Sequence, residues 1–261
     1  RRPAAAGPPA LSRDAGVSRA ACRLAYRTAK ETGILARTMA RPTTLDRTSL
    51  LAGVHELAAR DRHLARIVNQ FGPPPLWARP RGFPTLVRII LEQQVSLASA
   101  AALYARLDLH FEGEITPARV LVPGEAALLS LGVTRQKARY VVGLAARLAS
   151  GAVSLERVAR MPDAAAGATL IQVPGIGPWT AGVYLLMALR RPDVWPPGDL
   201  GLHKSMAEIR GLSAVPTSDE AAAFAMRWRP WRAVAARLLW HSYLSRRTKS
   251  WDRQPPAADH Q

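Results

Sequence analysis

Cysteine is nearly absent from this chain of 261 residues, which contains only Cys22. One thiol cannot build a disulfide framework, and it cannot supply the four cysteine ligands of a zinc or iron–sulfur site. We therefore predict that the protein carries no iron–sulfur cluster.

Long apolar runs are missing as well. No stretch approaches the ~18 consecutive apolar residues that a membrane span needs. The first residues lack the apolar segment of a secretory signal. These absences predict a cytoplasmic protein that has no membrane partner.

Strand signals are scarce, because alternating Val, Ile and Thr runs bounded by tight turns do not occur and no internal repeat is visible. Apolar residues instead recur at helical spacing between Leu45 and Phe71, and the stretch from Arg135 to Leu148 is amphipathic. Further helices are predicted from His203 to Ile209 and within Ser218 to Leu244. The predicted fold class is therefore all-α.

Acidic residues are few, and the formal net charge is +17 with an isoelectric point of about 11.4. Such an excess favours a polyanionic partner, nucleic acid before membrane. The alternative is a solvated arginine-rich surface without a function of its own. If nucleic acid is the partner, the cytoplasmic protein is expected to be nucleoid-associated.

Composition divides the chain into three parts. Residues 1–42 are rich in Arg, Ala and Pro and contain two acids, so we expect a basic, largely disordered arm with a possible short helix over 19–32. Residues 43–245 carry the helical periodicity, and residues 246–261 form a polar tail.

A glycine-rich turn organises the helical domain. Residues 170–182 (LIQVPGIGPWTAG) predict a helix, a tight turn and a second helix, with Gly175 and Gly177 free to take positive φ. The backbone N–H groups of Gly175, Ile176 and Gly177, placed ahead of a helix N-terminus, suit an anion such as phosphate.

Two other interpretations of this turn remain open. One is an ordinary helix–helix connection. The other is a dinucleotide-binding loop, but Thr180 occupies the place of its third glycine. In addition, the segment Trp195 to Gly198 contains two prolines and cannot be the strand that delivers the acid.

One carboxylate, Asp199, follows in residues 195–200 (WPPGDL), among Trp and Pro. This setting is poor in water and in other charges. The simplest role for Asp199 is as the N-cap of the next helix.

These motifs together resemble the helix-hairpin-helix superfamily of DNA glycosylases, and within it the 3-methyladenine DNA glycosylase II group. The resemblance runs from about Leu45 to Tyr243, and each motif alone is weak, but four in the family's order are specific. It implies two helical subdomains with the active-site cleft between them, and the sequence before Leu45 offers nothing for an N-terminal β domain. The remaining motifs are residues 90–96 (ILEQQVS), 131–138 (LGVTRQKA) and 228–232 (WRPWR).

The resemblance implies that Asp199 is catalytic. Cleavage of an N-glycosidic bond develops positive charge on the sugar, and an ionised carboxylate stabilises it. With an unperturbed pKa of ~3.9, Asp199 is expected to be ionised at neutral pH. Sugar hydrolases generally use two carboxylates, but Glu92 and Glu208, the nearest candidates for the second, are equally explained by exposed helix faces. An alkylated, cationic purine leaves without a proton donor, so one carboxylate suffices for it.

The resemblance also assigns the remaining site residues. Trp179 stands where strand-nicking members carry a Schiff-base lysine, which implies a monofunctional enzyme, and with Trp240 it lines the base pocket. Either tryptophan has core packing as its alternative. Gln94 matches the side chain that fills the gap left by a flipped base. Arg135, Lys137 and Lys204 are predicted phosphate contacts, Trp228 and Trp231 are predicted to be structural, and the hairpin carbonyls are expected to hold a structural monovalent cation.

The predicted function is therefore hydrolysis of alkylated bases from double-stranded DNA by a monomer. Two alternatives stay open: a glycosylase of the same scaffold for a deaminated or other lesion, and a DNA-binding helix-hairpin-helix module without catalysis.

Overall fold

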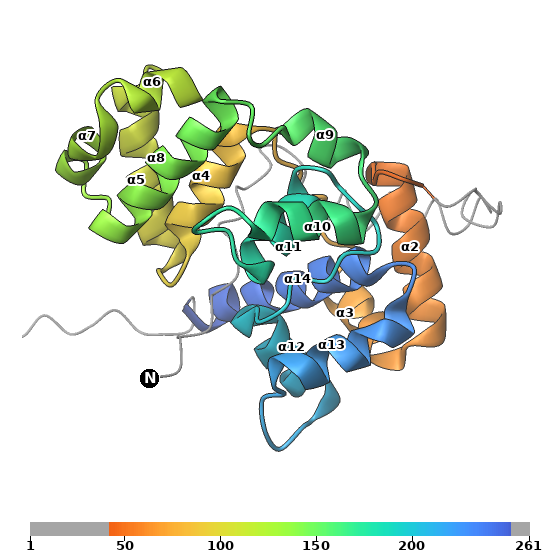
Figure 1. The fold of residues 1–261 in the computed structure, drawn as a ribbon. Helices are drawn as coiled ribbons and strands as arrows, with labels where there is room; N and C mark the ends of the chain where they lie inside the picture. Colours follow the sequence, from red (N-terminus) through yellow and green to blue (C-terminus); the bar gives the residue numbers. More distant parts are fainter. Residues whose placement is uncertain (1–41, 252–261) are drawn as a thin grey trace, which may run out of the picture.

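The computed structural model describes residues 42–251, and over this range the chain forms thirteen α-helices and one 3-10 helix, with no β-strand (Figure 1). The predicted all-α class is confirmed. The basic arm, its short helix, Cys22 and the predicted absence of an N-terminal β domain fall on residues outside this range. None of the described helices combines the length and apolarity required to cross a bilayer.

One helical subdomain is built around α8 and lies at the upper left of Figure 1. The apolar residues Ala138, Val141, Leu144 and Ala145 form one buried face of α8, as amphipathic spacing predicts. Helices α4, α6 and α7 pack on α8, and α5 packs on α4. The bounds are α4 (Phe83–Glu92), α5 (Leu97–His110), α6 (Pro117–Leu121), α7 (Gly124–Ser130) and α8 (Arg135–Ala149).

The second subdomain is built around the long helix α14, which packs against α2, α3 and α12 (Figure 1). Its Val234, Leu238, Leu239 and Trp240 are fully buried, and each such side chain contributes about 1.5–3 kcal/mol relative to exposure. The bounds are α2 (Arg47–Arg60), α3 (Arg62–Phe71), α12 (Leu200–Arg210), α13 (Ser218–Ala225), the 3-10 helix η2 (Met226–Trp228) and α14 (Arg232–Trp251).

The last helix is longer than the sequence predicted, because α14 continues to Trp251, six residues past the expected end of the helical domain at residue 245. Contacts one turn apart carry the helix past the last apolar residues. Arg246 donates to the Ser242 hydroxyl at 3.2 Å, and the Arg247 guanidinium lies 4.7 Å from the centre of the Tyr243 ring.

Helices α9 (Leu155–Arg160), α10 (Asp163–Ile171) and α11 (Pro178–Met187) join the two subdomains. Helix α11 is apolar on all sides and buried from Trp179 to Met187, and it contacts α10 and α4. Gly182 allows a close approach on this helix, since a Cβ there would lie 2.8 Å from the Pro196 backbone. The segment before Asp199 therefore packs directly on α11.

Candidate active site

The carboxylate of Asp199 is completely buried, with 0 % of the residue exposed. It caps α12 by accepting the Leu202 backbone N–H on Oδ1 at 2.9 Å. The indole N–H of Trp179 donates to Oδ2 at 2.9 Å, and that of Trp240 donates to Oδ1 at 3.1 Å. The close packing at Gly182 thus brings together the three residues predicted to form the chemical centre.

Burial raises the pKa of Asp199 to about 6, and the Trp179 indole, the Leu202 N–H and the Trp240 indole oppose this rise by stabilising the charged form. The unperturbed pKa expected from the sequence is therefore wrong. At pH 7 the ionised form of the carboxylate still outnumbers the protonated form by about ten to one. An ionised acid in a dry site acts strongly on any nearby positive charge.

The hairpin turn between α10 and α11 is fixed by Gly175. Its φ is +88°, and a Cβ at this position would overlap the Tyr140 ring on α8. The Gln93 amide donates to the Gly175 carbonyl at 2.8 Å and to the Thr180 hydroxyl at 2.9 Å. Helices α4 and α8 therefore both hold this turn in place.

Two expectations for the turn need correction. Gly177 has φ −83° and ψ 177°, an extended conformation open to any residue, so it does not use positive φ. The N–H of Ile176 donates to the Val173 carbonyl at 3.0 Å and its side chain is buried, so this N–H is already used within the turn. Within the described residues, the N–H groups of Gly175 and Gly177 form no hydrogen bond, and Gly177 is exposed.

A hollow of about 540 Å³ lies over this turn, and it is lined by Gln94, Lys137, Trp179 and the three residues Gly175, Ile176 and Gly177. Gln94 is exposed between α4 and α5 and has a left-handed φ of +57°. A glutamine in this conformation is strained by roughly 1 kcal/mol or more. Strain of this kind, on the rim of a hollow, is typical of a functional position.

The three predicted phosphate contacts are separated in the structure. Arg135 is exposed on the first turn of α8. Lys137 differs from expectation: its half-buried ammonium donates to the Leu91 and Gln93 carbonyls at 2.7 and 2.8 Å, so it caps α4. Burial lowers the pKa of this lysine. Lys204 lies apart from the hairpin, in a second hollow with Tyr243, Arg246 and Arg247.

The possible second acids are accounted for. The exposed helix face expected for Glu92 is wrong, because Glu92 is buried and Arg79 holds it by two bonds of 2.8 and 3.0 Å. Glu208 is exposed near the end of α12 and lies 3.9 Å from Arg246. The prediction that Trp228 and Trp231 are structural agrees with their contacts, because both are buried and their indoles bond to Asp61 and Glu56.

Sequence reasoning missed two residues that shape this site. Gln93 was given no role, although it ties α4 to the turn, and Tyr140 was not singled out. Both act across long sequence separations, which spacing along one helix cannot reveal. The sequence carried a signal only for Gln93, which stands next to Gln94 in the motif of residues 90–96.

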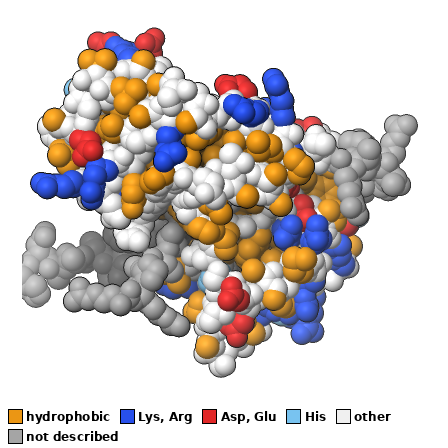
Figure 2. Space-filling model, viewed as in Figure 1, with side chains coloured by type: hydrophobic (Ala, Val, Ile, Leu, Met, Phe, Trp, Pro, Cys, Tyr) orange, Lys and Arg blue, Asp and Glu red, His pale blue; other side chains and the backbone are white. Residues whose placement is uncertain are grey.

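On the face seen in Figure 2, Lys and Arg side chains stand in separate groups, with hydrophobic or uncharged surface between them.

Comparison with known proteins identifies the family to which this chain is similar. The family model described as HhH-GPD superfamily base excision DNA repair protein matches residues 87–230. DNA-3-methyladenine glycosylase of Bacillus subtilis is 30% identical over 73% of this chain and 66% of its own length, and DNA-3-methyladenine glycosylase 2 of Escherichia coli is 29% identical over 60% and 56%. The chain thus spans between about half and two thirds of these relatives.

A solved structure has the same fold. The Schizosaccharomyces pombe 3-methyladenine DNA glycosylase, in complex with abasic DNA, superposes with a TM-score of 0.64 over 72% of this chain and 94% of its own, at 24% identity. The family model covers more than half of the chain, so the chain belongs to the HhH-GPD superfamily of base excision DNA repair proteins.

Proposed function

We propose that this protein is a DNA glycosylase that hydrolyses the N-glycosidic bond of alkylated bases, of the 3-methyladenine type, in duplex DNA. The observation that carries the proposal is the ionisable Asp199 carboxylate, dry and bonded to two indoles. The chain's membership of the superfamily and the names of its relatives support the same activity. The reaction consumes only water, so it requires no cofactor.

In this mechanism the target nucleotide leaves the helix stack and Gln94 fills the gap. The N–H groups of Gly175 and Gly177 bind a phosphate, which fixes the sugar. As the base departs, Asp199 stabilises the positive charge that develops near C1′ and orients the attacking water. At ~4 Å this attraction is about 1 kcal/mol in water and ~4 kcal/mol at an effective dielectric of 20. Because Asp199 is fully buried, the side chains that cover it must move to admit the sugar.

A cationic base explains why one carboxylate is enough. Such a base carries its positive charge before cleavage and leaves as a neutral molecule, so no general acid is needed. Two observations support a mechanism without a general acid: Arg79 holds Glu92 through two hydrogen bonds, and Glu208 is exposed. The faces of Trp179 and Trp240 attract an electron-poor ring by roughly 0.5–2 kcal/mol.

We also propose that the enzyme is monofunctional. Strand nicking through a Schiff base needs an amine nucleophile, and Trp179 occupies that hairpin position. The lysines whose side chains are described are Lys137, which caps α4, and Lys204, which lies in another hollow. For the structural cation, the Val173 and Gly175 carbonyls each accept one hydrogen bond and keep a second lone pair, so the turn is compatible with it.

The test is a panel of duplexes, each with one N3-methyladenine, hypoxanthine, uracil or 8-oxoguanine, incubated with the full chain. We expect release of the methylated purine to be fastest and normal bases to stay in place. Fastest release of a deaminated base would favour a same-fold glycosylase for another lesion. Binding to abasic-site DNA without release from any duplex would instead favour a non-catalytic DNA-binding protein.

The pH dependence of base release gives a further prediction. Asp199 must be ionised to act, and its pKa is raised to about 6, so kcat/KM should fall as pH decreases through 6. At pH 5 the rate should be about tenfold below its plateau above pH 7. Single-turnover release of N3-methyladenine, followed from above pH 7 down to pH 4.5, measures this fall in rate. A rate that stays flat down to pH 4.5 would contradict the role of the buried carboxylate.

Replacing Trp240 by phenylalanine should move this fall in rate, the acid limb of the pH profile, to higher pH. The change keeps an aromatic ring but removes the 3.1 Å indole bond to Asp199, so the charged form loses a donor and its pKa rises. We expect the limb to shift by about one pH unit. Trp195→Phe is the matched control, because the Trp195 indole N–H is buried without a partner. Equal profiles for wild type and Trp240→Phe would show that this bond does not tune the acid.

A further inference from the structure

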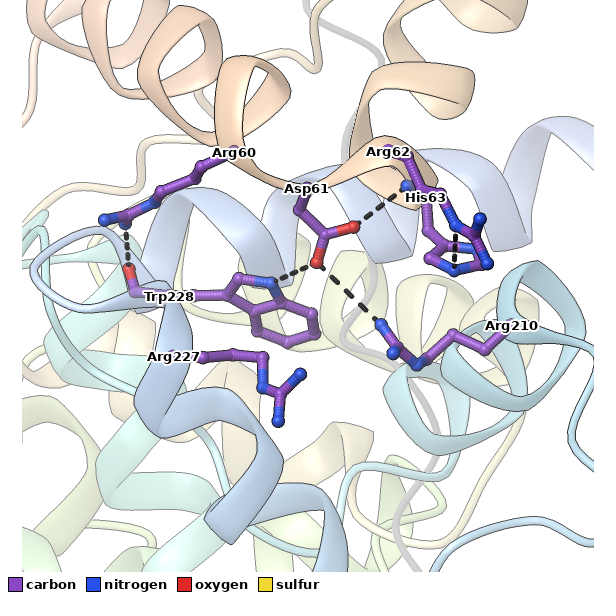
Figure 3. A pocket seen from close by; sticks show the side chains of 7 residues that line it. All are labelled: Arg60, Asp61, Arg62, His63, Arg210, Arg227 and Trp228. Carbon is purple, nitrogen blue, oxygen red and sulfur yellow. Dashed lines mark hydrogen bonds and ion pairs between the residues drawn. The ribbon is translucent and has the colours of Figure 1, made fainter.

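A third hollow, of about 460 Å³, lies where α2 meets α3 and where α12 and η2 end (Figure 3). We call it the arginine pocket. Its charged lining consists of the guanidinium groups of Arg60, Arg62, Arg210 and Arg227 and one carboxylate, Asp61. Nothing in the proposed glycosylase mechanism uses these residues.

The single acid is already fully engaged. Asp61 caps α3 by accepting the His63 and Leu64 N–H groups at 2.9 and 3.3 Å. It also accepts the Trp228 indole at 2.9 Å and lies 3.8 Å from Arg210 (Figure 3). These bonds lower the pKa of Asp61, although burial opposes them. Asp61 is thus a structural anion, and it cannot neutralise three more cations.

Arg60 is structural too, because it bonds to the Trp228 and Arg229 carbonyls and lies 3.4 Å from Glu56. Arg62 and Arg227 differ: within the described part of the chain, neither lies within ion-pair distance of a carboxylate. The pocket therefore holds more positive charge than its own acid balances.

Two of the guanidiniums are held by stacking. Arg210 and Arg227 lie 3.9 and 4.0 Å from the centre of the Phe224 ring. Stacking fixes their position without using their N–H donors, so these donors remain available to a ligand. Burial, together with the positive charges of Arg227 and Arg62, lowers the pKa of Arg210 against the opposing effect of Asp61. An added anion would relieve this repulsion.

His63 contributes no charge in this arrangement. Its Nδ1 lies 2.7 Å from the Ile209 carbonyl and must carry the proton, so Nε2 accepts from Arg62 Nε at 3.3 Å. This neutral tautomer holds the Arg62 side chain at the pocket.

We propose that the arginine pocket binds a phosphoryl anion. Arg62, Arg210 and Arg227 reach it from three different elements, α3, α12 and η2. A planar carboxylate matches one guanidinium fork, whereas a phosphoryl group presents oxygens in several directions and suits guanidiniums that arrive from different sides. An acidic peptide is therefore the less suitable ligand.

The phosphoryl group has two possible sources. Asp199 and Arg210 stand at opposite ends of α12, which spans 11 residues, or roughly 16 Å. That separation matches DNA phosphates a few nucleotides from the nucleotide whose sugar faces Asp199, and it equally allows a free phosphorylated compound. The experiment below separates the two.

The test compares Arg62→Gln/Arg227→Gln with wild type in calorimetric titrations of inorganic phosphate at constant ionic strength. The full chain is used, and the ion pair of Arg210 with Asp61 is left intact. Arg147→Gln/Arg157→Gln is the matched control, because it removes the same charge from exposed helix ends. We expect phosphate affinity to fall about tenfold in the pocket variant and to stay within about twofold in the control.

The salt dependence of binding to an undamaged duplex identifies the source. A slope that decreases by about 0.9 per lost contact in the pocket variant alone indicates the DNA backbone, whereas an unchanged slope with lost phosphate binding indicates a free compound. Absent phosphate binding, equal losses in both variants, or tighter binding of a glutamate-rich peptide than of phosphate would overturn the proposal. Base release from a short duplex should be unchanged in the pocket variant, so the outcome does not depend on the glycosylase assignment.

Discussion

Replacing Asp199 by asparagine is expected to lower the rate of base release by about 10²–10³-fold. The charge that stabilises the developing cation at C1′ disappears. In addition, Trp179 donates to one carboxylate oxygen of Asp199 and Trp240 donates to the other. Asparagine replaces one of these oxygens by an –NH₂ group, which cannot accept a hydrogen bond. Single-turnover release of N3-methyladenine at pH 7.5 measures the loss, and thermal unfolding confirms that the variant is folded.

Glu208→Gln is the matched control, since it neutralises an exposed acid on the same helix. We expect its rate to remain within about twofold of wild type, as for a surface change. If Asp199→Asn retains a third or more of the activity, or if Glu208→Gln loses as much as it does, a lone catalytic carboxylate is wrong.

Gly175→Ala is expected to destabilise the protein by about 2–4 kcal/mol. The left-handed backbone costs an alanine about 1 kcal/mol, and the added Cβ overlaps the Tyr140 ring, an overpacking cost of about 1–3 kcal/mol. For a domain of this size the melting temperature should fall by roughly 5–15 °C. Thermal unfolding measures the fall, and DNA affinity should decrease with it because the turn moves.

Gly177→Ala separates stability from DNA contact. Its backbone is extended and no atom lies within 4 Å of the new Cβ, so stability should stay equal or rise slightly. The Cβ would still hold a phosphate away from the Gly177 N–H, and duplex affinity should fall about tenfold. Unchanged binding by a stable Gly177→Ala protein would argue against a phosphate at this turn.

Local patterns in the sequence were sufficient for much of the fold. The apolar spacing of α8 predicted its buried face, and Asp199 was correctly expected to cap α12. These features depend on residues within one or two helical turns of each other. For the same reason, the end of α14 was placed too early, because periodicity does not record contacts such as Arg246 with Ser242.

The environment of the site depends on packing between distant segments and could not be predicted. The raised pKa of Asp199 follows from complete burial, which requires the close contact at Gly182. Lys137 was predicted as a phosphate contact, and its bond to the end of α4 depends on the packing of α8 against that helix. Arg237 is the extreme case: it is fully buried, burial lowers its pKa to about 9, and it donates to the Leu76, Leu186 and Ala233 carbonyls.

The most direct test of the account is a crystal structure of this chain bound to a duplex that contains an abasic-site analogue. We predict that the side chains covering Asp199 move aside, that C1′ lies about 3.5 Å from an Asp199 carboxylate oxygen, and that a phosphate accepts hydrogen bonds from the Gly175 and Gly177 N–H groups. A complex in which Asp199 stays sealed by both indoles, with the analogue bound elsewhere, would contradict the role assigned to this carboxylate.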